Sequence, residues 1–395
     1  MPDQTYQNYQ ATSNRMSKEK VILAIQDTTT LNYTNHSQTH GLGTIGTNKH
    51  LQGMLVHTTL AFTPQRVPLG ILHQQVWTRS PETYGKKHQR KKRAITEKES
   101  QKWLNSLEAT RTIHKESPDT LVISVGDREA DIYELFHHAS DYPQSCHLLV
   151  RAAWDRKVEH PQKYLWPSME TQPVADTFEV IVPRKKNKSE RSAHIDIRFA
   201  PLTLLPPQNK SRLGPLTLWA VYVNEPSPPH GEEPLSWMLL TTLKVESLDE
   251  ALCLVNYYSV RFSIELFHKV LKSGCTIEKR QLQTAEGLIR CLALDSLVAW
   301  RIMFLTMIGR AVPQLPCTVL FGEHEWKALY CFINTTKTLP LFPPSLQEAT
   351  RLVARLGGFL GRERDGFPGT EILWRGMQKL ASISAAWIAF GPHTV

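Results

Sequence analysis

A series of apolar, strand-like runs interrupted by one polar helix constrains the fold of this chain more than any other feature. The strand-like runs lie at 21–31, 54–62, 69–77, 121–125 and 147–152, and an amphipathic helix is predicted over 97–116. Strands and helices that alternate in this way are typical of an α/β sheet. Asp27 lies near the end of the first run, and Asp127 closely follows the fourth. Because α/β sheets bind ligands beyond the carboxyl ends of their strands, we expect both acids to lie in a functional site.

The sequence changes character twice after this region. Prolines are dense and short β-like runs appear from residue 153 to about 245, which predicts a separate, mostly antiparallel β insertion. Helical patterns return at Ser247 and persist to the end. The predicted segments are a polar tail at 1–20, the first part of an α/β core at 21–152, the β insertion at 153–246, the second part of the core at 247–312 and a helical domain at 313–395.

Composition narrows the partners and the location of the protein. The chain has 395 residues, with 46 Lys and Arg against 37 Asp and Glu, for a net charge of +9. This balance favours a polyanionic partner, nucleic acid ahead of an anionic membrane surface. Six cysteines without a Cys-x-x-Cys pair favour free thiols in a reducing cytoplasm. The most apolar long segment, 291–309, contains Asp295 and Arg301, so we expect a buried helix rather than a membrane span.

Residues 257–274, YYSVRFSIELFHKVLKSG, carry a polar stripe on a predicted helix. The stripe consists of Tyr258, Arg261, Glu265 and Lys272. At about 100° per residue these four side chains fall within an arc of roughly 60°, and apolar residues cover most of the remaining surface. A solvated stripe on an amphipathic helix is the simpler interpretation. However, a single acid among three phosphate-compatible groups also matches one metal ligand within a phosphate clamp.

Other patterns carry less information. The GLGTIG run at 41–46 lacks the preceding strand and following helix that a dinucleotide site requires. Glu129 and Asp131 are explained by the favourable position of acids at a helix N-terminus. Two basic runs, at 86–93 and 184–191, are most simply solvated loops, with phosphate contact as the alternative.

The spacing Tyr-x2-Arg-x3-Glu-x6-Lys of the polar stripe is similar to the signature of the insertion-sequence-four family of DDE transposases. The segments IQDTT around Asp27, DREADI from Asp127 and SIELFHK from Ser263 also resemble family motifs. The likeness extends in order from about residue 21 to 385. It implies a ribonuclease-H-like catalytic core with an antiparallel β insertion and a C-terminal helical dimerisation domain.

The resemblance implies that Asp27, Asp127 and Glu265 are catalytic and hold two Mg²⁺ ions, which Mn²⁺ can replace. A metal pair can activate a water or a 3′-hydroxyl and stabilise the leaving oxygen of an in-line displacement. The family uses such a site for cut-and-paste transposition, in which it nicks the transposon end, forms and reopens a DNA hairpin, and joins the end to target DNA. The implied partners are transposon ends, target DNA and a second copy of the chain once DNA is bound.

The DNA-binding residues that the resemblance implies are Tyr258, Arg261, Lys272, Trp237 and Arg151. Trp237 lies 21 residues before Tyr258, where the family has a tryptophan that stacks on a flipped base. Without the resemblance, a core tryptophan on a strand is the simpler interpretation of Trp237. Arg151 corresponds to a phosphate-contacting arginine of the family. Helices at about 345–388 are expected to form the dimer interface.

One departure from the family concerns the region before Asp27. The family has an N-terminal helical domain that recognises the transposon ends, and here 26 residues precede Asp27. An alternative is therefore an N-terminally truncated, non-transposing DNA-binding or inhibitor protein derived from such a transposase. A non-transposing nuclease with the same metal site is a second alternative. The resemblance also implies a bacterial cytoplasmic protein associated with the nucleoid.

Overall fold

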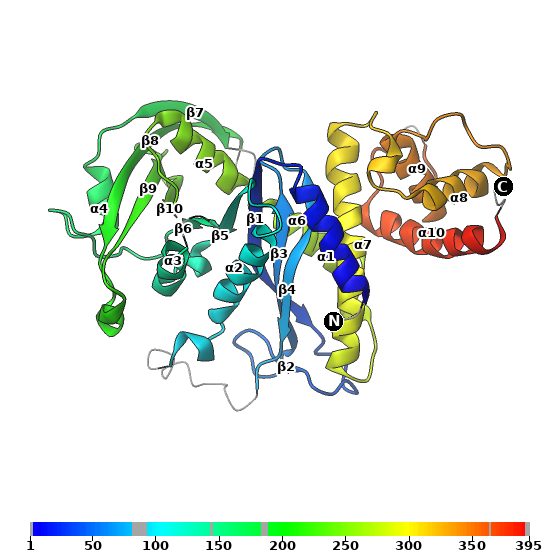
Figure 1. Cartoon of the computed structure of the whole chain (residues 1–395), viewed down its shortest axis with the longest axis horizontal. Helices are drawn as coiled ribbons and strands as arrows, with labels where there is room; N and C mark the ends of the chain where they lie inside the picture. Colours follow the sequence, from blue (N-terminus) through cyan, green and yellow to red (C-terminus); the bar gives the residue numbers. More distant parts are fainter. Residues whose placement is uncertain are drawn as a thin grey trace.

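The computed structural model describes residues 3–80, 93–142, 144, 146–182, 189–362 and 365–391. Figure 1 shows one large sheet, helices packed on it, and a helical bundle at one side. The strands are β1 Val21–Asn32, β2 Gly43–Thr44, β3 Gln52–Phe62, β4 Pro68–Trp77, β5 Leu121–Gly126, β6 His147–Arg151, β7 Asp176–Val182, β8 Arg191–Leu204, β9 Leu216–Asn224 and β10 Ser236–Thr241. The helices are α1 Asp3–Met16, α2 Gln101–His114, α3 Tyr133–Ser140, α4 Leu165–Glu170, α5 Leu248–Val260, α6 Ser263–Lys269, α7 Ala285–Ala311, α8 Glu323–Asn334, α9 Leu346–Leu356 and α10 Thr370–Phe390.

The sheet is parallel at its centre and antiparallel on both sides. Within the described residues its order is β2-β3-β1-β5-β6-β10-β9-β8-β7, and β4 pairs with β3. β1 runs parallel to β5, with Ile25 opposite Val125, and β5 runs parallel to β6. β3 is antiparallel to β1, and β10 is antiparallel to β6. The register places the residues that follow β5 beside the middle of β1, where Asp27 lies.

Alternate residues of β1 enter two hydrophobic cores. Leu23 and Ile25 pack in the core that includes residues of α5, α6 and α7, whereas Ile22 and Ala24 pack in the core that includes residues of α2 and α3. A strand that is covered on both faces must be apolar throughout, which explains the run VILAI. The predicted α/β class and the C-terminal helical region are thus confirmed, and the ribonuclease-H-like assignment of the core stays a prediction.

The antiparallel strands after residue 153 do not form the separate unit that the sequence predicts. β7–β10 extend the core sheet, because β10 pairs with β6 and Leu239 lies opposite Arg151. Leu239 and Leu240 are fully buried, so this pairing continues both hydrophobic layers of the core. The antiparallel pairing itself is confirmed, and the predicted segment boundaries stay predictions.

Residues 3–16, predicted as part of a polar tail, instead form helix α1, which packs against β4. Met16 is fully buried, and Nε of Arg15 donates a 2.6 Å hydrogen bond to the carbonyl oxygen of Leu69. The helix crosses the strand at Gly70, where φ is 154° and a Cβ atom would lie 2.1 Å from Oγ1 of Thr12. The prediction failed because a few buried contacts, rather than an apolar face, hold this helix.

Helix α7 is the one helix of the described residues that is long and apolar enough to cross a membrane. It packs within the protein: Leu292, Ala299 and Ile302 are fully buried in the larger core. Asp295, near its middle, accepts two hydrogen bonds from Arg280, at 2.7 and 3.0 Å. A carboxylate buried in this way is stable only when it is paired. The predicted buried helix is therefore confirmed.

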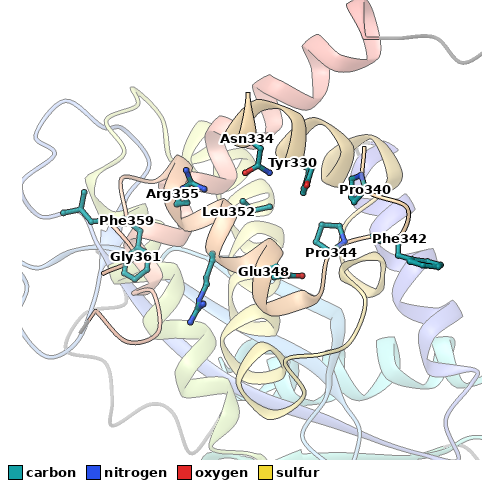
Figure 2. A pocket seen from close by; sticks show the side chains of 13 residues that line it. Tyr330, Asn334, Pro340, Phe342, Pro344, Glu348, Leu352, Arg355, Phe359 and Gly361 are labelled. Atoms are coloured by element: carbon teal, nitrogen blue, oxygen red, sulfur yellow. The ribbon is translucent and has the colours of Figure 1, made fainter. Parts of the chain in front are cut away.

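Helices α8, α9 and α10 form a bundle on the far side of α7 from the sheet (Figure 1). α9 and α10 approach each other closely at Gly376, where a Cβ atom would lie 2.0 Å from the carbonyl oxygen of Val353. A groove of about 730 Å³ opens between α8, α9 and the neighbouring loops (Figure 2). Its lining includes Tyr330, Leu352 and Arg355, so it belongs to the bundle and not to the edge of the sheet that carries Asp27.

Gly376→Ala is expected to destabilise the C-terminal bundle by about 3 kcal/mol, because the added methyl group would overlap a backbone carbonyl that cannot rotate away. Gly309→Ala is the matched control, since its Cβ atom in α7 would meet its nearest neighbour at 3.6 Å. Urea unfolding of both variants measures the difference. Equal stability of the two variants would contradict this packing.

Candidate functional site

Two acids predicted to follow strands lie side by side at the parallel centre of the sheet. Asp127 directly follows β5, as predicted. Asp27 lies in the middle of β1 rather than near its end, because β1 continues to Asn32 and pairs with β3 over this length. Parallel pairing with β5 nevertheless stops at Ile25 and Val125. Asp27 and Asp127 each lie two residues beyond this last pair. Because side chains alternate between the two faces of a sheet, both acids face the same side.

The guanidinium of Arg261 connects these acids with Glu265. Its Nη2 lies 3.2 Å from Oδ2 of Asp27 and 3.6 Å from Oδ2 of Asp127. Its Nη1 lies 3.2 Å from Oε1 of Glu265, one turn further along the chain. Arg261 is only 7% exposed, so its guanidinium is largely shielded from water, whereas the side chain of its partner Glu265 is 60% exposed. Residues from β1, the β5 end and α6 thus share one buried cation.

Backbone hydrogen bonds orient the two aspartates toward this point. Oδ1 of Asp27 accepts a 2.7 Å hydrogen bond from the N–H of Thr28, and Oδ1 of Asp127 accepts one of 2.9 Å from the N–H of Glu129. The Oδ2 atoms remain directed at Nη2 of Arg261. Because both lie so close to one nitrogen atom, they are no more than about 7 Å apart, a separation that a pair of metal ions about 4 Å apart could span.

The polar stripe of residues 257–274 is not a solvated helix face, which is the simpler interpretation of its sequence. Tyr258 and Arg261 are buried, whereas the side chain of Glu265 is 60% exposed. The predicted single helix is also interrupted: α5 ends at Val260, α6 begins at Ser263, and Lys272 lies in the π-helical segment Val270–Gly274. Arg261 and Phe262 keep right-handed helical dihedrals at this junction, and Arg261 contacts the acids of the sheet.

Aromatic residues and a second arginine adjoin Arg261. The rings of Trp237, on β10, and Tyr258 meet edge to face at 5.2 Å between centroids, and Phe262 lies 6.0 Å from Trp237. Nη2 of Arg151, at the end of β6, donates a 2.7 Å hydrogen bond to the carbonyl oxygen of Ser236. Burial raises the pKa of Tyr258, while Arg151 and Arg261 lower it in part. Four of the five predicted DNA-binding residues thus form one cluster; Lys272 lies one segment away.

Sequence reasoning missed His268, which lies three residues after Glu265. Nδ1 of His268 is 4.0 Å from Oδ2 of Asp27, and its buried Nε2 has no hydrogen-bond partner in the described part of the chain. Burial, Lys272 and Arg261 lower the pKa of His268 to about 3, so the imidazole is neutral near Asp27. Its position in the SIELFHK segment was visible in the sequence, but its burial was not.

Asp131 has a role different from the helix-terminus effect predicted for it. Its Oδ2 accepts hydrogen bonds from the backbone N–H groups of Ala153 and Trp154, at 2.7 and 3.0 Å. Its Oδ1 pairs with Arg156, whose Nε lies at 2.8 Å. Asp131 is 4% exposed, so it anchors the turn after β6 from inside the protein. Glu129 instead pairs with Lys102 at 3.0 Å.

The predicted basic runs add little to this cluster. Residues 86–92 and 184–188 lie outside the described residues. Of the remainder, Arg191 forms a bidentate ion pair with Glu225, which neutralises its charge. Phosphate contact by these runs stays a prediction.

The three carboxylates offer oxygen donors only, the type that Mg²⁺ prefers. Among the described residues, no group of three or more His, Cys, Asp or Glu side chains is arranged so that it could hold a metal ion as it stands. Here the point toward which the acids converge is taken by Arg261. The donor set therefore fits a hard divalent cation on the condition that the guanidinium moves aside.

Replacing Asp27 with Asn is expected to stabilise the metal-free protein at pH 8. Burial raises the pKa of Asp27 to about 6, and the attraction of Arg261 reverses this only in part. A raised pKa means that the folded state holds the proton more tightly than the unfolded chain, so stability falls as the pH rises through about 6. The variant should gain roughly 1–3 kcal/mol at pH 8 and nothing at pH 4. Thermal unfolding in EDTA measures this, with exposed Asp119→Asn as control; a variant less stable than the parent at pH 8 would contradict it.

Comparison with known proteins gives a family match over part of the chain. Residues 297–389, from within α7 to the end of α10, match the family model described as Transposase Tn5 dimerisation domain. A solved chain titled "Cryo-EM structure of piggyBac transposase synaptic complex with hairpin DNA (SNHP)" resembles the fold at a TM-score of 0.36 and 7% identity. The alignment covers 74% of this chain and 48% of that one, so this chain spans about half the length of that transposase. The match over 297–389 supports a transposase whose C-terminal helices correspond to a dimerisation domain.

Proposed function

We propose that this protein is the DDE core of a cut-and-paste transposase of the insertion-sequence-four family. Asp27, Asp127 and Glu265 would be its catalytic carboxylates. The observation that carries the proposal is the convergence of these three acids on Arg261, at 3.2–3.6 Å. They come from a central strand, the end of its parallel neighbour and a helix. The dimerisation-domain match over 297–389 is independent support, because it lies outside the residues that form the cluster.

In the proposed site, the three acids hold two Mg²⁺ ions, or Mn²⁺ in their place. When bound, such a pair would supply the Lewis-acid chemistry of phosphoryl transfer, which is activation of a water or 3′-hydroxyl and stabilisation of the leaving oxygen. The backbone hydrogen bonds to Asp27 and Asp127 keep their second oxygens directed into the site. Glu265 is exposed on α6, so it is the acid that can change position most easily.

Arg261 would exchange its partners when DNA binds. In the structure described here its two terminal nitrogens offset part of the negative charge of the acids, and the same two nitrogens would bind a phosphate in a bidentate manner. Its position at the break between α5 and α6 gives the side chain access to both partners. Arg151 and Lys272 would contact neighbouring phosphates, and the hydroxyl of Tyr258 would add a hydrogen bond.

Trp237 would stack on a flipped base during hairpin formation, as the family resemblance implies. Its ring is edge to face with Tyr258 and tilted at 36° to Phe262, so these two side chains hold the indole in one orientation. An indole held in this way replaces the stacking that an extruded base loses. The nicking, hairpin-forming and joining steps would then take place at one site, with the transposon end and the target DNA as substrates.

Cleavage of DNA that carries the ends of the element tests the proposal. The parent should cleave it with Mg²⁺ or Mn²⁺ and not with EDTA. Asp127→Asn and Glu265→Gln should each lower the cleavage rate at least about 1,000-fold, because each removes a charge that the transition state requires. Asp119→Asn, the same change just before the opposite end of β5, should cleave like the parent. Cleavage by Asp127→Asn at more than a tenth of the parental rate would contradict the assignment.

The C-terminal helices are proposed to form a homodimer on DNA. Ile388 on α10 is 58% exposed, although the helix packs elsewhere in the bundle. Ile388→Glu should weaken dimerisation about 10-fold or more, since it would place a charge in an apolar contact. Sedimentation velocity with and without end DNA measures the change, and Glu159→Gln, outside the bundle, serves as control. A DNA complex that contains one copy of the parent chain would overturn this part of the proposal.

A further inference from the structure

Trp154 is exposed to an extent unusual for tryptophan. The chain has ten tryptophans, all in described positions, and Trp154 alone is classed as exposed, at 65%. Large aromatic side chains generally bury most of their surface, so an exposed indole is informative where it is held near a functional site. Trp154 lies in the turn after β6, three residues beyond Arg151.

The turn that carries Trp154 is anchored from beneath. Its backbone N–H and that of Ala153 both donate to Oδ2 of the buried Asp131. Arg156, on the other side of Trp154, donates to the side chain and to the backbone carbonyl of Asp131. The backbone is therefore held in place while the indole remains in solvent. Such preorganisation lowers the entropic cost of binding a ligand to the ring.

The same anchor connects Trp154 with the acidic cluster. Asp131 lies four residues after Asp127, on the segment that leaves β5, and β5 and β6 are parallel neighbours. The ends of these two strands therefore lie at the same edge of the sheet. Trp154, three residues beyond Arg151, therefore lies at the same edge of the sheet as Asp127 and Arg151.

This edge of the sheet carries two arginines beside its acids Asp127 and Asp155. Arg128, next to Asp127, is exposed. It also lies close to Arg151: burial is the main cause that lowers the pKa of Arg151, and the positive charge of Arg128 is the second. Arg156 is neutralised by Asp131. Asp155, the acid adjacent to Trp154, accepts a 3.0 Å hydrogen bond from the N–H of Trp166. An exposed indole at the same edge of the sheet as two arginines suits binding of a single-stranded nucleic acid, since arginine contacts the phosphates and the ring stacks on a base.

We propose that Trp154 is a stacking platform for an unpaired base of the DNA strand whose phosphates contact Arg128 and Arg151. This inference rests on the proposed function and assigns a residue that the family motifs do not include. Trp154 differs from Trp237, whose faces are partly covered by Tyr258 and Phe262. It would act on the strand once that strand has left the duplex, at the edge of the site.

Binding measurements in EDTA test the inference without any cleavage step. The probes are an oligothymidylate, a forked duplex with an unpaired strand, and a blunt duplex. Trp154→Ala should weaken binding to the first two about 5- to 100-fold and to the blunt duplex less than about 2-fold. Trp154→Phe should retain most of the affinity, because phenylalanine preserves an aromatic face. The salt dependence should not change, since no charge is removed.

Fluorescence gives a second readout. Oligothymidylate should quench part of the tryptophan emission of the parent, and this part should be absent in Trp154→Phe. Phe332→Ala, which removes a remote ring that is 59% exposed, should behave like the parent. Unchanged quenching in Trp154→Phe, equal affinity of Trp154→Ala and the parent for unpaired DNA, or an equal loss on blunt and unpaired DNA would each overturn the inference.

The outcomes separate this inference from the proposed function. A parent that binds unpaired DNA through Trp154 but cleaves no end DNA with Mg²⁺ or Mn²⁺ would overturn the proposed function and leave the stacking role intact. A parent that cleaves end DNA but does not bind unpaired strands would overturn the stacking role alone.

Discussion

The site depends on one buried guanidinium that holds three carboxylates from distant parts of the chain. Burial imposes a desolvation cost on Asp27, which is the main reason that its pKa is raised even beside a cation, and the charges of Asp127 and Glu129 raise it further. Arg261 offsets part of this cost. Its Nε is buried and has no hydrogen-bond partner in the described residues. Its two terminal nitrogens contact the three acids. A guanidinium held in this way is ready to change partners when a divalent cation or a phosphate offers a stronger one.

The sheet places every other member of the cluster relative to this contact. The parallel register of β1 and β5 aligns Asp27 with Asp127. The pairing of β6 with β10 brings Arg151 next to Trp237, although the two residues are 86 positions apart in the sequence. The β insertion therefore does more than extend the sheet, because its last strand supplies the indole that packs on Tyr258. On the opposite face, the buried hydrogen bonds of His57 to Thr28 and Gln26 hold β1 to β3 beside Asp27.

Much of this arrangement could be predicted from local patterns. The strand-like runs, the acids that follow them and the spacing of Arg261 and Glu265 are all visible within short segments. The break between α5 and α6 could not be predicted, because neither Gly nor Pro marks it in VRFSIE. The burial of Tyr258 depends on Trp237 from another segment, and the anchoring of Trp154 depends on Asp131. Helix α1 escaped prediction for the same reason, since its contacts are with a strand that comes later in the chain.

Anomalous diffraction from crystals grown with Mn²⁺ tests the central claim most directly. The account predicts manganese peaks between Oδ2 of Asp27 and Oδ2 of Asp127, at about 2.0–2.4 Å from these oxygens, with the guanidinium of Arg261 displaced from its contacts with them. Manganese bound only elsewhere, with the three ion pairs of Arg261 intact, would contradict the claim that these acids form a cation site.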